Sequence, residues 1–214
     1  MRSSWSWMSL ASVSMARSMV RKLLSSCSRQ RRYSASVAAT AAAGFLPLAR
    51  AQDAGAIVLG QSCALTGFSG ELGVQYHQGA QLFFDDLNSK GGINGREVRI
   101  RVLDDGYEPE RCVANTQRFI KDDVFALFGY LGTPTSVAAL PLVQQERIPL
   151  FAPLTGAQAL RQQNLRQLVF NVRASYADET ALMVRQLTGL GLKKIAVFYQ
   201  NDGYGQSGLE GVTQ

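Results

Sequence analysis

Hydroxyl residues and glycines gather in four short segments, each directly after a run of apolar or β-branched residues. Backbone N–H groups at helix starts, together with the positive end of the helix dipole, suit a carboxylate or another anion. A single Ser or Thr there most often only caps a helix, so it is the convergence of several at one edge that favours a binding site. The segments are Ser62–Gly70, Asp104–Glu108, Gly129–Thr135 and Pro153–Ala157.

Catalytic chemistry has little support. His77 is the only histidine, which excludes a His-based triad and a His-rich metal site, and it is predicted to be a structural or surface residue. The spacing of Gly67, Gly70 and Gly73 is not the dinucleotide fingerprint, and there is no P-loop. Asp104-Asp105 could ligate a metal, but an acidic pair at a strand end is more often a solvated turn. No enzyme, metal or cofactor is therefore implied.

After residue 51 the chain has two cysteines, Cys63 and Cys112. An even pair in an oxidising compartment favours a disulfide, and both residues are expected at the same edge of the sheet if their strands are neighbours. A Cys63–Cys112 bridge is predicted, and the alternative is two buried thiols.

The elements that must position these segments alternate between strands and helices. This order predicts an α/β fold with a doubly wound parallel sheet, its ligand site beyond the carboxyl ends of the strands. Strands are expected at 57–61, 97–103, 124–128, 148–152, 168–172 and 194–199, and helices at 71–89, 109–121, 134–146, 177–190 and from about 204.

The basic charge of the chain belongs to its first 51 residues. The whole chain has a net charge of +6, but residues 1–51 carry eight Lys and Arg and no Asp or Glu, so the remainder is slightly acidic. A nucleic-acid partner is therefore not expected. Arg31-Arg32, an Ala-rich run and Ala49-Arg50-Ala51 predict an export signal of the Sec or twin-arginine type, cleaved after Ala51, and a periplasmic protein.

Residues 56–214 resemble the type I periplasmic binding proteins, specifically the branched-chain amino-acid-binding family of ABC importers. The resemblance rests on several short motifs in the same order and spacing. They are Ala64-Leu65-Thr66-Gly67, Gly91-Gly92-Ile93-Asn94-Gly95-Arg96, Asp104-Asp105, Thr133-Pro134-Thr135, Pro149…Pro153 and Asn201-Asp202-Gly203-Tyr204-Gly205.

The resemblance implies two α/β lobes that close on a solute. It places the solute's carboxylate and ammonium groups at Gly132, Thr133 or Thr135, and at Leu154, Thr155 and Gly156, with Ser69 and Gly70 nearby and Tyr204 packed over the solute from the second lobe. Gly156 stands where the family usually has a Thr, which argues against a plain aliphatic amino acid.

The expected function is that of a periplasmic solute-binding protein, which delivers an amino acid or a similar small carboxylate to an ABC permease in the inner membrane. Residues 1–51 would be the signal peptide, 52–173 the first lobe, and 174–214 the start of a truncated second lobe. Two alternatives remain: an exported sensor or regulator of the same fold, and a nucleotide-dependent enzyme, against which the missing fingerprint argues.

Overall fold

A single parallel sheet organises the chain. The computed structural model describes residues 55–213, so the predicted leader and its cleavage site lie outside the described part. The sheet has the order β2-β1-β3-β4-β5, and every neighbouring pair is parallel. Its strands are β1 (Ile57–Cys63), β2 (Val98–Asp104), β3 (Ala126–Phe128), β4 (Leu150–Phe151) and β5 (Val169–Phe170). The predicted α/β class and the first five predicted strands are confirmed.

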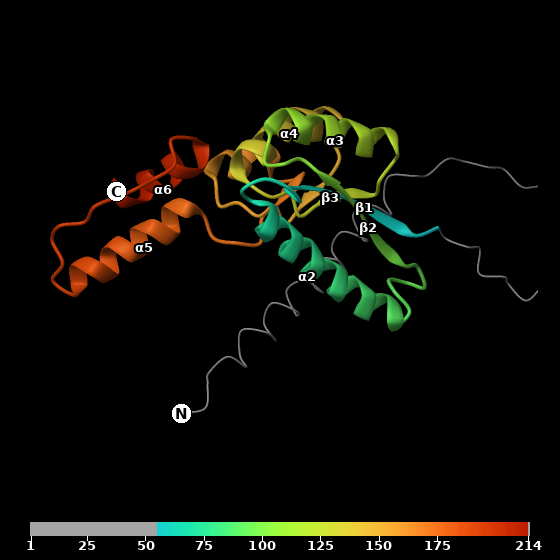
Figure 1. Ribbon diagram of the computed structural model, residues 1–214, viewed down its shortest axis with the longest axis horizontal. Coiled ribbons are helices and arrows are strands. Elements are labelled where there is room, and N and C mark those ends of the chain that lie inside the picture. The colour runs from blue at the N-terminus through green and yellow to red at the C-terminus, as the bar shows by residue number, and fades with distance from the viewer. Residues whose placement is uncertain (1–54, 214) are drawn as a thin grey trace, which may run out of the picture. The chain divides into compact units, whose positions relative to one another are not determined.

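Helices cover both faces of this sheet. Helix α2 (Gly70–Ser89) lies on one face, and α3 (Pro109–Lys121) and α4 (Thr133–Gln145) lie together on the other (Figure 1). Two short 3-10 turns, η1 (Gln158–Arg161) and η2 (Gln163–Leu165), connect β4 to β5. Two helical layers bury the inner strands on both faces, which is why β3 and β4 are short apolar runs, whereas the edge strand β2 alternates apolar residues with Arg99 and Arg101.

Each face has its own apolar core. On the α2 face, Phe84 packs with Ile57 and Val98. The larger core lies under α3 and α4 and includes Phe119 and Leu127, both fully buried. These cores fix the height of the helices above the sheet and hence the position of every loop at its carboxyl edge.

Helices α5 (Tyr176–Gly189) and α6 (Gly203–Thr213) form a closely packed pair. The Thr180 hydroxyl donates to the Gly208 carbonyl at 2.8 Å, and a Cβ on Gly211 would overlap the same Thr180 side chain. Helix α5 begins at a capped end, where Ser175 Oγ accepts a hydrogen bond from the Asp178 amide at 3.0 Å. The predicted boundary between residues 173 and 174 precedes this pair and stays a prediction.

The sixth predicted strand, 194–199, is not formed. Within the described part of the chain, no amide of residues 193–200 donates a backbone hydrogen bond, and Phe198 is fully exposed. An apolar, β-branched run becomes a strand only beside another strand, and among residues 55–213 none lies next to it. None of the described helices is long and apolar enough to span a membrane.

Candidate functional site

The order of the strands creates a crevice at one edge of the sheet. Strand β1 pairs with β2 on one side and β3 on the other, so the loops after β1 and β3 lead to helices on opposite faces. In open α/β sheets, ligands bind in the crevice that opens between such diverging loops, beyond the carboxyl ends of the strands. The four segments predicted from the sequence all lie at this edge.

Two predicted threonines meet there. The hydroxyl oxygens of Thr133, at the start of α4, and Thr155, after β4, lie 2.6 Å apart in a hydrogen bond, and both side chains are buried. Their loops are held in register by a parallel bridge between Leu131 and Leu154 and by a 2.7 Å hydrogen bond from the Leu154 amide to the Tyr130 carbonyl. The structure therefore brings two of the predicted binding residues into direct contact.

The neighbouring Gly132 and Thr135 have mainly structural roles. Gly132 caps α4 with φ of 100°, a conformation that glycine adopts without steric cost. The Thr135 hydroxyl is fully buried and donates back to the Leu131 carbonyl at 2.5 Å. Its hydrogen is already used within the first turn of the helix, so the structure favours the capping role for Thr135 over the predicted role as a donor to a solute.

Asp104 ties the loop after β1 to the loop after β2. Its carboxylate accepts hydrogen bonds from the Leu65 amide at 2.8 Å and the Thr66 hydroxyl at 2.7 Å, and it pairs with Arg111 at 2.8 Å. Desolvation opposes ionisation, but these hydrogen bonds and one from the Gly106 amide outweigh it and hold the pKa of Asp104 well below its ordinary value. The carboxylate is thus a structural latch, and among the described residues no cluster of three or more potential metal ligands is found.

Ser69 and Gly70 lie at the end of this loop. Ser69 is the N-cap residue of α2 without a side-chain cap hydrogen bond, and the Gly70 amide donates to the Gly67 carbonyl at 3.1 Å. Within residues 55–213, no hydrogen bond joins them to the threonine pair. Their predicted place beside the solute stays a prediction.

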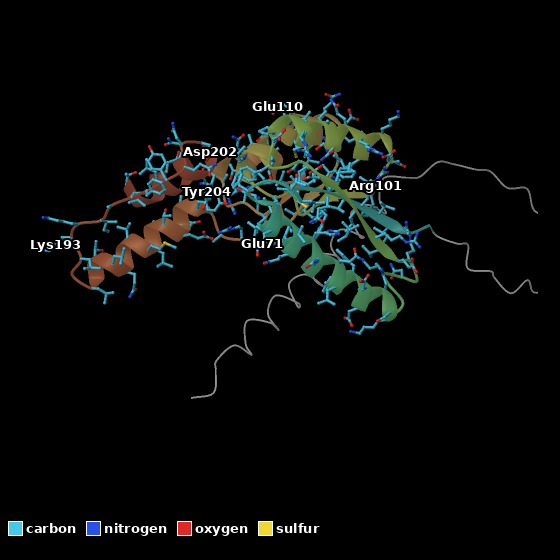
Figure 2. The ribbon with its side chains drawn as sticks, viewed as in Figure 1. Glu71, Arg101, Glu110, Lys193, Asp202 and Tyr204 are labelled. Atoms are coloured by element: carbon cyan, nitrogen blue, oxygen red, sulfur yellow. The ribbon has the colours of Figure 1, made fainter. Side chains whose placement is uncertain are left out.

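The starts of α5 and α6 lie near the threonine pair: Tyr204 is the second residue of α6, and Gly156 follows Thr155 in the loop after β4. A Cβ on Gly203, the first residue of α6, would lie 3.5 Å from the Thr133 methyl carbon. Figure 2 shows Asp202 and Tyr204 at this end of α6, away from Lys193. The Gly156 carbonyl accepts from the Tyr176 amide at 2.9 Å, which places the start of α5 against the loop after β4.

Sequence reasoning missed two aromatic residues, Tyr107 and Tyr176. Tyr107 stands in one of the four segments and has a positive φ of 68°. Tyr176 packs edge-on against Tyr204, with ring centroids 5.1 Å apart. The available signal was a tyrosine in a turn beside Asp104-Asp105, which by itself does not distinguish a surface residue from a binding residue.

His77 has the structural role that the sequence predicts. Its Nδ1 lies 2.7 Å from Gln61 Oε1, while the Gln61 amide nitrogen donates to the Gly129 carbonyl at 3.3 Å. Because the Gln61 oxygen can only accept, His77 Nδ1 carries the proton. Burial lowers the pKa of this histidine, which suits the neutral ring.

The predicted Cys63–Cys112 disulfide is not present. Both cysteines are fully buried as free thiols, as in the alternative interpretation. Burial raises the pKa of each thiol to about 12, and the charge of Asp105 acts in the same direction. The thiols therefore belong to the packed interior beneath the β1 and β2 loops.

Comparison with known proteins agrees with the geometry. Residues 56–214 match the family model described as periplasmic binding protein. The chain is 28% identical over 162 residues to the amino acid binding protein of Pseudomonas aeruginosa, a match covering 74% of this chain and 42% of the relative. It therefore spans less than half the length of the curated relatives it matches.

Solved structures give the same result. A possible leucine/isoleucine/valine-binding protein from Rhodopirellula baltica superposes with a TM-score of 0.70 at 40% identity, over 75% of this chain and 44% of that one. A fatty acid ABC transporter substrate-binding protein from Thermomonospora curvata superposes with a TM-score of 0.67 at 26% identity, over 74% and 40%. The resemblance and the type I fold expected from the sequence are confirmed, and the chain belongs to the periplasmic binding protein family.

Proposed function

We propose that this chain is the first lobe and the beginning of the second lobe of an exported solute-binding protein. The solute is an amino acid or a related small carboxylate, and the receiving partner is an ABC permease in the inner membrane. The names of the relatives support this assignment, as does the predicted leader.

The observation that carries the proposal is the Thr133–Thr155 pair. Two hydroxyls, 2.6 Å apart and buried at the carboxyl edge of the sheet, can together donate one hydrogen bond and accept others. Thr133 is also the first residue of α4, where backbone N–H groups are free of intrahelical partners and the helix dipole is positive. A solute carboxylate would replace the contact between the two threonines with a hydrogen bond from each.

Closure follows from the position of α6. Its first residue lies against Thr133, so a solute at the threonine pair would contact elements on both sides of the crossing between the lobes, which the family resemblance places near residues 171–175. A ligand that touches both lobes shifts an open–closed equilibrium toward the closed state. The proposed mechanism is therefore lobe closure, and no covalent chemistry is involved.

Calorimetry of the 214-residue chain against amino acids and small carboxylates tests the proposal. Thr133→Val with Thr155→Val should weaken binding by about 10-fold or more, because hydrogen bonds to a charged group contribute roughly 1.5–3 kcal/mol each. Thr188→Val is the matched control, since that exposed hydroxyl bonds only within α5. Unchanged affinity in the double variant would show that the solute binds elsewhere.

A further inference from the structure

Two tyrosine rings pack directly on glycines of the candidate site. A Cβ on Gly132 would overlap the ring of Tyr107, and a Cβ on Gly156 would lie 3.0 Å from Cδ1 of Tyr176. Gly132 precedes Thr133 and Gly156 follows Thr155 in the sequence. An aromatic ring therefore packs on the glycine next to each threonine of the pair.

Tyr107 is held in place at an energetic cost. Its φ of 68° lies in the left-handed region, which non-glycine residues occupy only where the surroundings fix them. Two contacts fix it here: its amide donates to the buried carboxylate of Asp105 at 2.9 Å, and its ring packs edge-on against Phe68 with centroids 5.2 Å apart. Such strain, retained at a ligand-binding edge, indicates that the placement of this ring matters.

Tyr176 continues the aromatic surface from the other side. Its ring packs edge-on against Tyr204, at an interplanar angle of 75°. Burial, followed by the nearby Asp202, raises the pKa of Tyr107 to about 12, so its phenol stays protonated. The rings of Tyr107 and Tyr176 thus lie next to the two residues that adjoin the threonine pair, and Tyr204 extends the aromatic surface from Tyr176.

An organic cation does not fit this surface. The Arg173 guanidinium already lies 4.9 Å from the centre of the Tyr176 ring, and its charge is shared with both carboxylate oxygens of Glu179 at 2.7 Å. A second cation would be repelled from the face that Arg173 occupies. A neutral aromatic ring suits the remaining surface, because aromatic rings gain from edge-to-face and offset contacts beyond the area that they bury.

We propose that the solute is an aromatic carboxylate, with its ring packed among Tyr107, Tyr176 and Tyr204 and its carboxylate at the Thr133–Thr155 pair. This inference rests on the proposed function and narrows it to a class of solute. Gly156 keeps the ring of Tyr176 in this place, because a Cβ there would lie 2.8 Å from the Tyr176 amide nitrogen and 2.9 Å from the Ala174 carbonyl oxygen and would push the start of α5 away.

The test compares benzoate with cyclohexanecarboxylate, which match in charge and size and differ in aromaticity. Both are titrated against the 214-residue chain by ligand-observed NMR, which detects millimolar affinities. Benzoate should bind about 3- to 10-fold more tightly. Phenylalanine and leucine form a second pair, which shows whether the solute also carries an amino group.

Variants assign the preference to the tyrosines. Tyr107→Leu and Tyr176→Leu should each reduce benzoate binding about 3- to 10-fold and leave cyclohexanecarboxylate unchanged, whereas Tyr107→Phe should retain the preference. Tyr199→Leu, which changes a half-exposed tyrosine of the 193–200 segment, is the control and should have no effect.

The two levels of the proposal fail differently. Equal binding of benzoate and cyclohexanecarboxylate overturns the aromatic preference and leaves a carboxylate-binding protein. Binding of none of the four probes overturns the proposed function and the preference with it. An aromatic preference that survives both leucine variants overturns the placement of the ring.

Discussion

Asp104 and Asp105 are adjacent in the sequence, but their carboxylates meet opposite environments. Asp104 accepts hydrogen bonds from two loops, and its pKa is lowered. Asp105 is fully buried, and burial raises its pKa although the Ser62 hydroxyl and the Tyr107 amide donate to it. The first carboxylate therefore stabilises the fold when ionised, whereas ionisation of the second opposes folding.

Replacing Asp104 should weaken the fold and flatten its response to acid. A depressed folded pKa contributes stability above the unfolded value of about 3.9, and this contribution is lost as the pH falls below it. Asp104→Asn should therefore lower the free energy of unfolding at pH 7 by about 1–3 kcal/mol and by less at pH 3. Urea titrations at both pH values measure the difference.

The control for that experiment is Asp86→Asn. Asp86 pairs with Lys90 at 2.6 Å, but both side chains are more than half exposed, so the change should stay within about 0.5 kcal/mol. An Asp104→Asn effect as small as this would show that Asp104 does not latch the two loops.

The thiols of Cys63 and Cys112 should be protected by the fold and not by a covalent bond. Because burial raises both pKa values to about 12, neither should react quickly with an aromatic disulfide reagent at pH 8 in the native chain. Cys27, the third cysteine of the sequence, is first replaced by Ser so that only these two thiols are counted. After denaturation without reduction, titration with the same reagent should detect two equivalents of thiol per chain. No released thiol would mean that the predicted disulfide forms.

At the scale of elements, helix α3 approaches the sheet closely at Gly60 in β1. A Cβ there would lie 2.6 Å from the ring of Phe119, a fully buried residue of α3. Helix α3 can rest on the middle of the sheet only because β1 lacks a side chain at this point. The same packing sets the height of the loop that carries Tyr107, which precedes α3.

Gly60→Ala should destabilise the chain by about 1–3 kcal/mol, because an added carbon in a close-packed core forces backbone or ring movement. The matched control is Gly79→Ala on the exposed side of α2, where nothing lies within 4 Å of the new Cβ. That change should stabilise the helix by about 0.5–1 kcal/mol. Thermal melts followed by circular dichroism show whether each variant is less or more stable than the unchanged chain. A Gly60→Ala variant of unchanged stability would show that α3 is free to shift.

The elements were predictable because their signals are local. Glycine and asparagine at 91–95 end α2, and Pro109 begins α3, so neither boundary depends on distant residues. That Thr133 and Thr155 lie at the same edge of the sheet followed from strand order together with a resemblance, whereas their direct contact did not. The packing of Tyr107 on Gly132 was not predictable, because it joins loops after different strands and depends on a positive φ that tyrosine rarely adopts. The wrong disulfide prediction has the same origin, since spacing along a chain does not fix the geometry of two buried sulfurs.

At the scale of the whole molecule, the described part of the chain has one sheet with a packed core on each face, and one open surface. The five-stranded sheet is covered on both faces by helices. The pair formed by α5 and α6 instead adjoins a hollow of about 490 Å³, lined by apolar residues such as Met183, Val197 and Leu209. A strand-forming sequence lies beside this hollow without a hydrogen-bonded neighbour, so stability should differ sharply between the two parts.

Hydrogen exchange should show this difference directly. Amides of residues 193–200 have no backbone acceptor in the described structure, so they should exchange within about tenfold of the rate of an unfolded chain. Amides of β1 lie in a strand paired on both sides and should be protected by several orders of magnitude under the same conditions. Exchange mass spectrometry of peptides covering the two segments, at two protein concentrations, measures both.

Slow exchange at 193–200 that is independent of concentration would mean that the predicted sixth strand forms within one chain. Protection that grows with concentration would instead mean that copies pair through this exposed apolar edge, as unpaired strands tend to do.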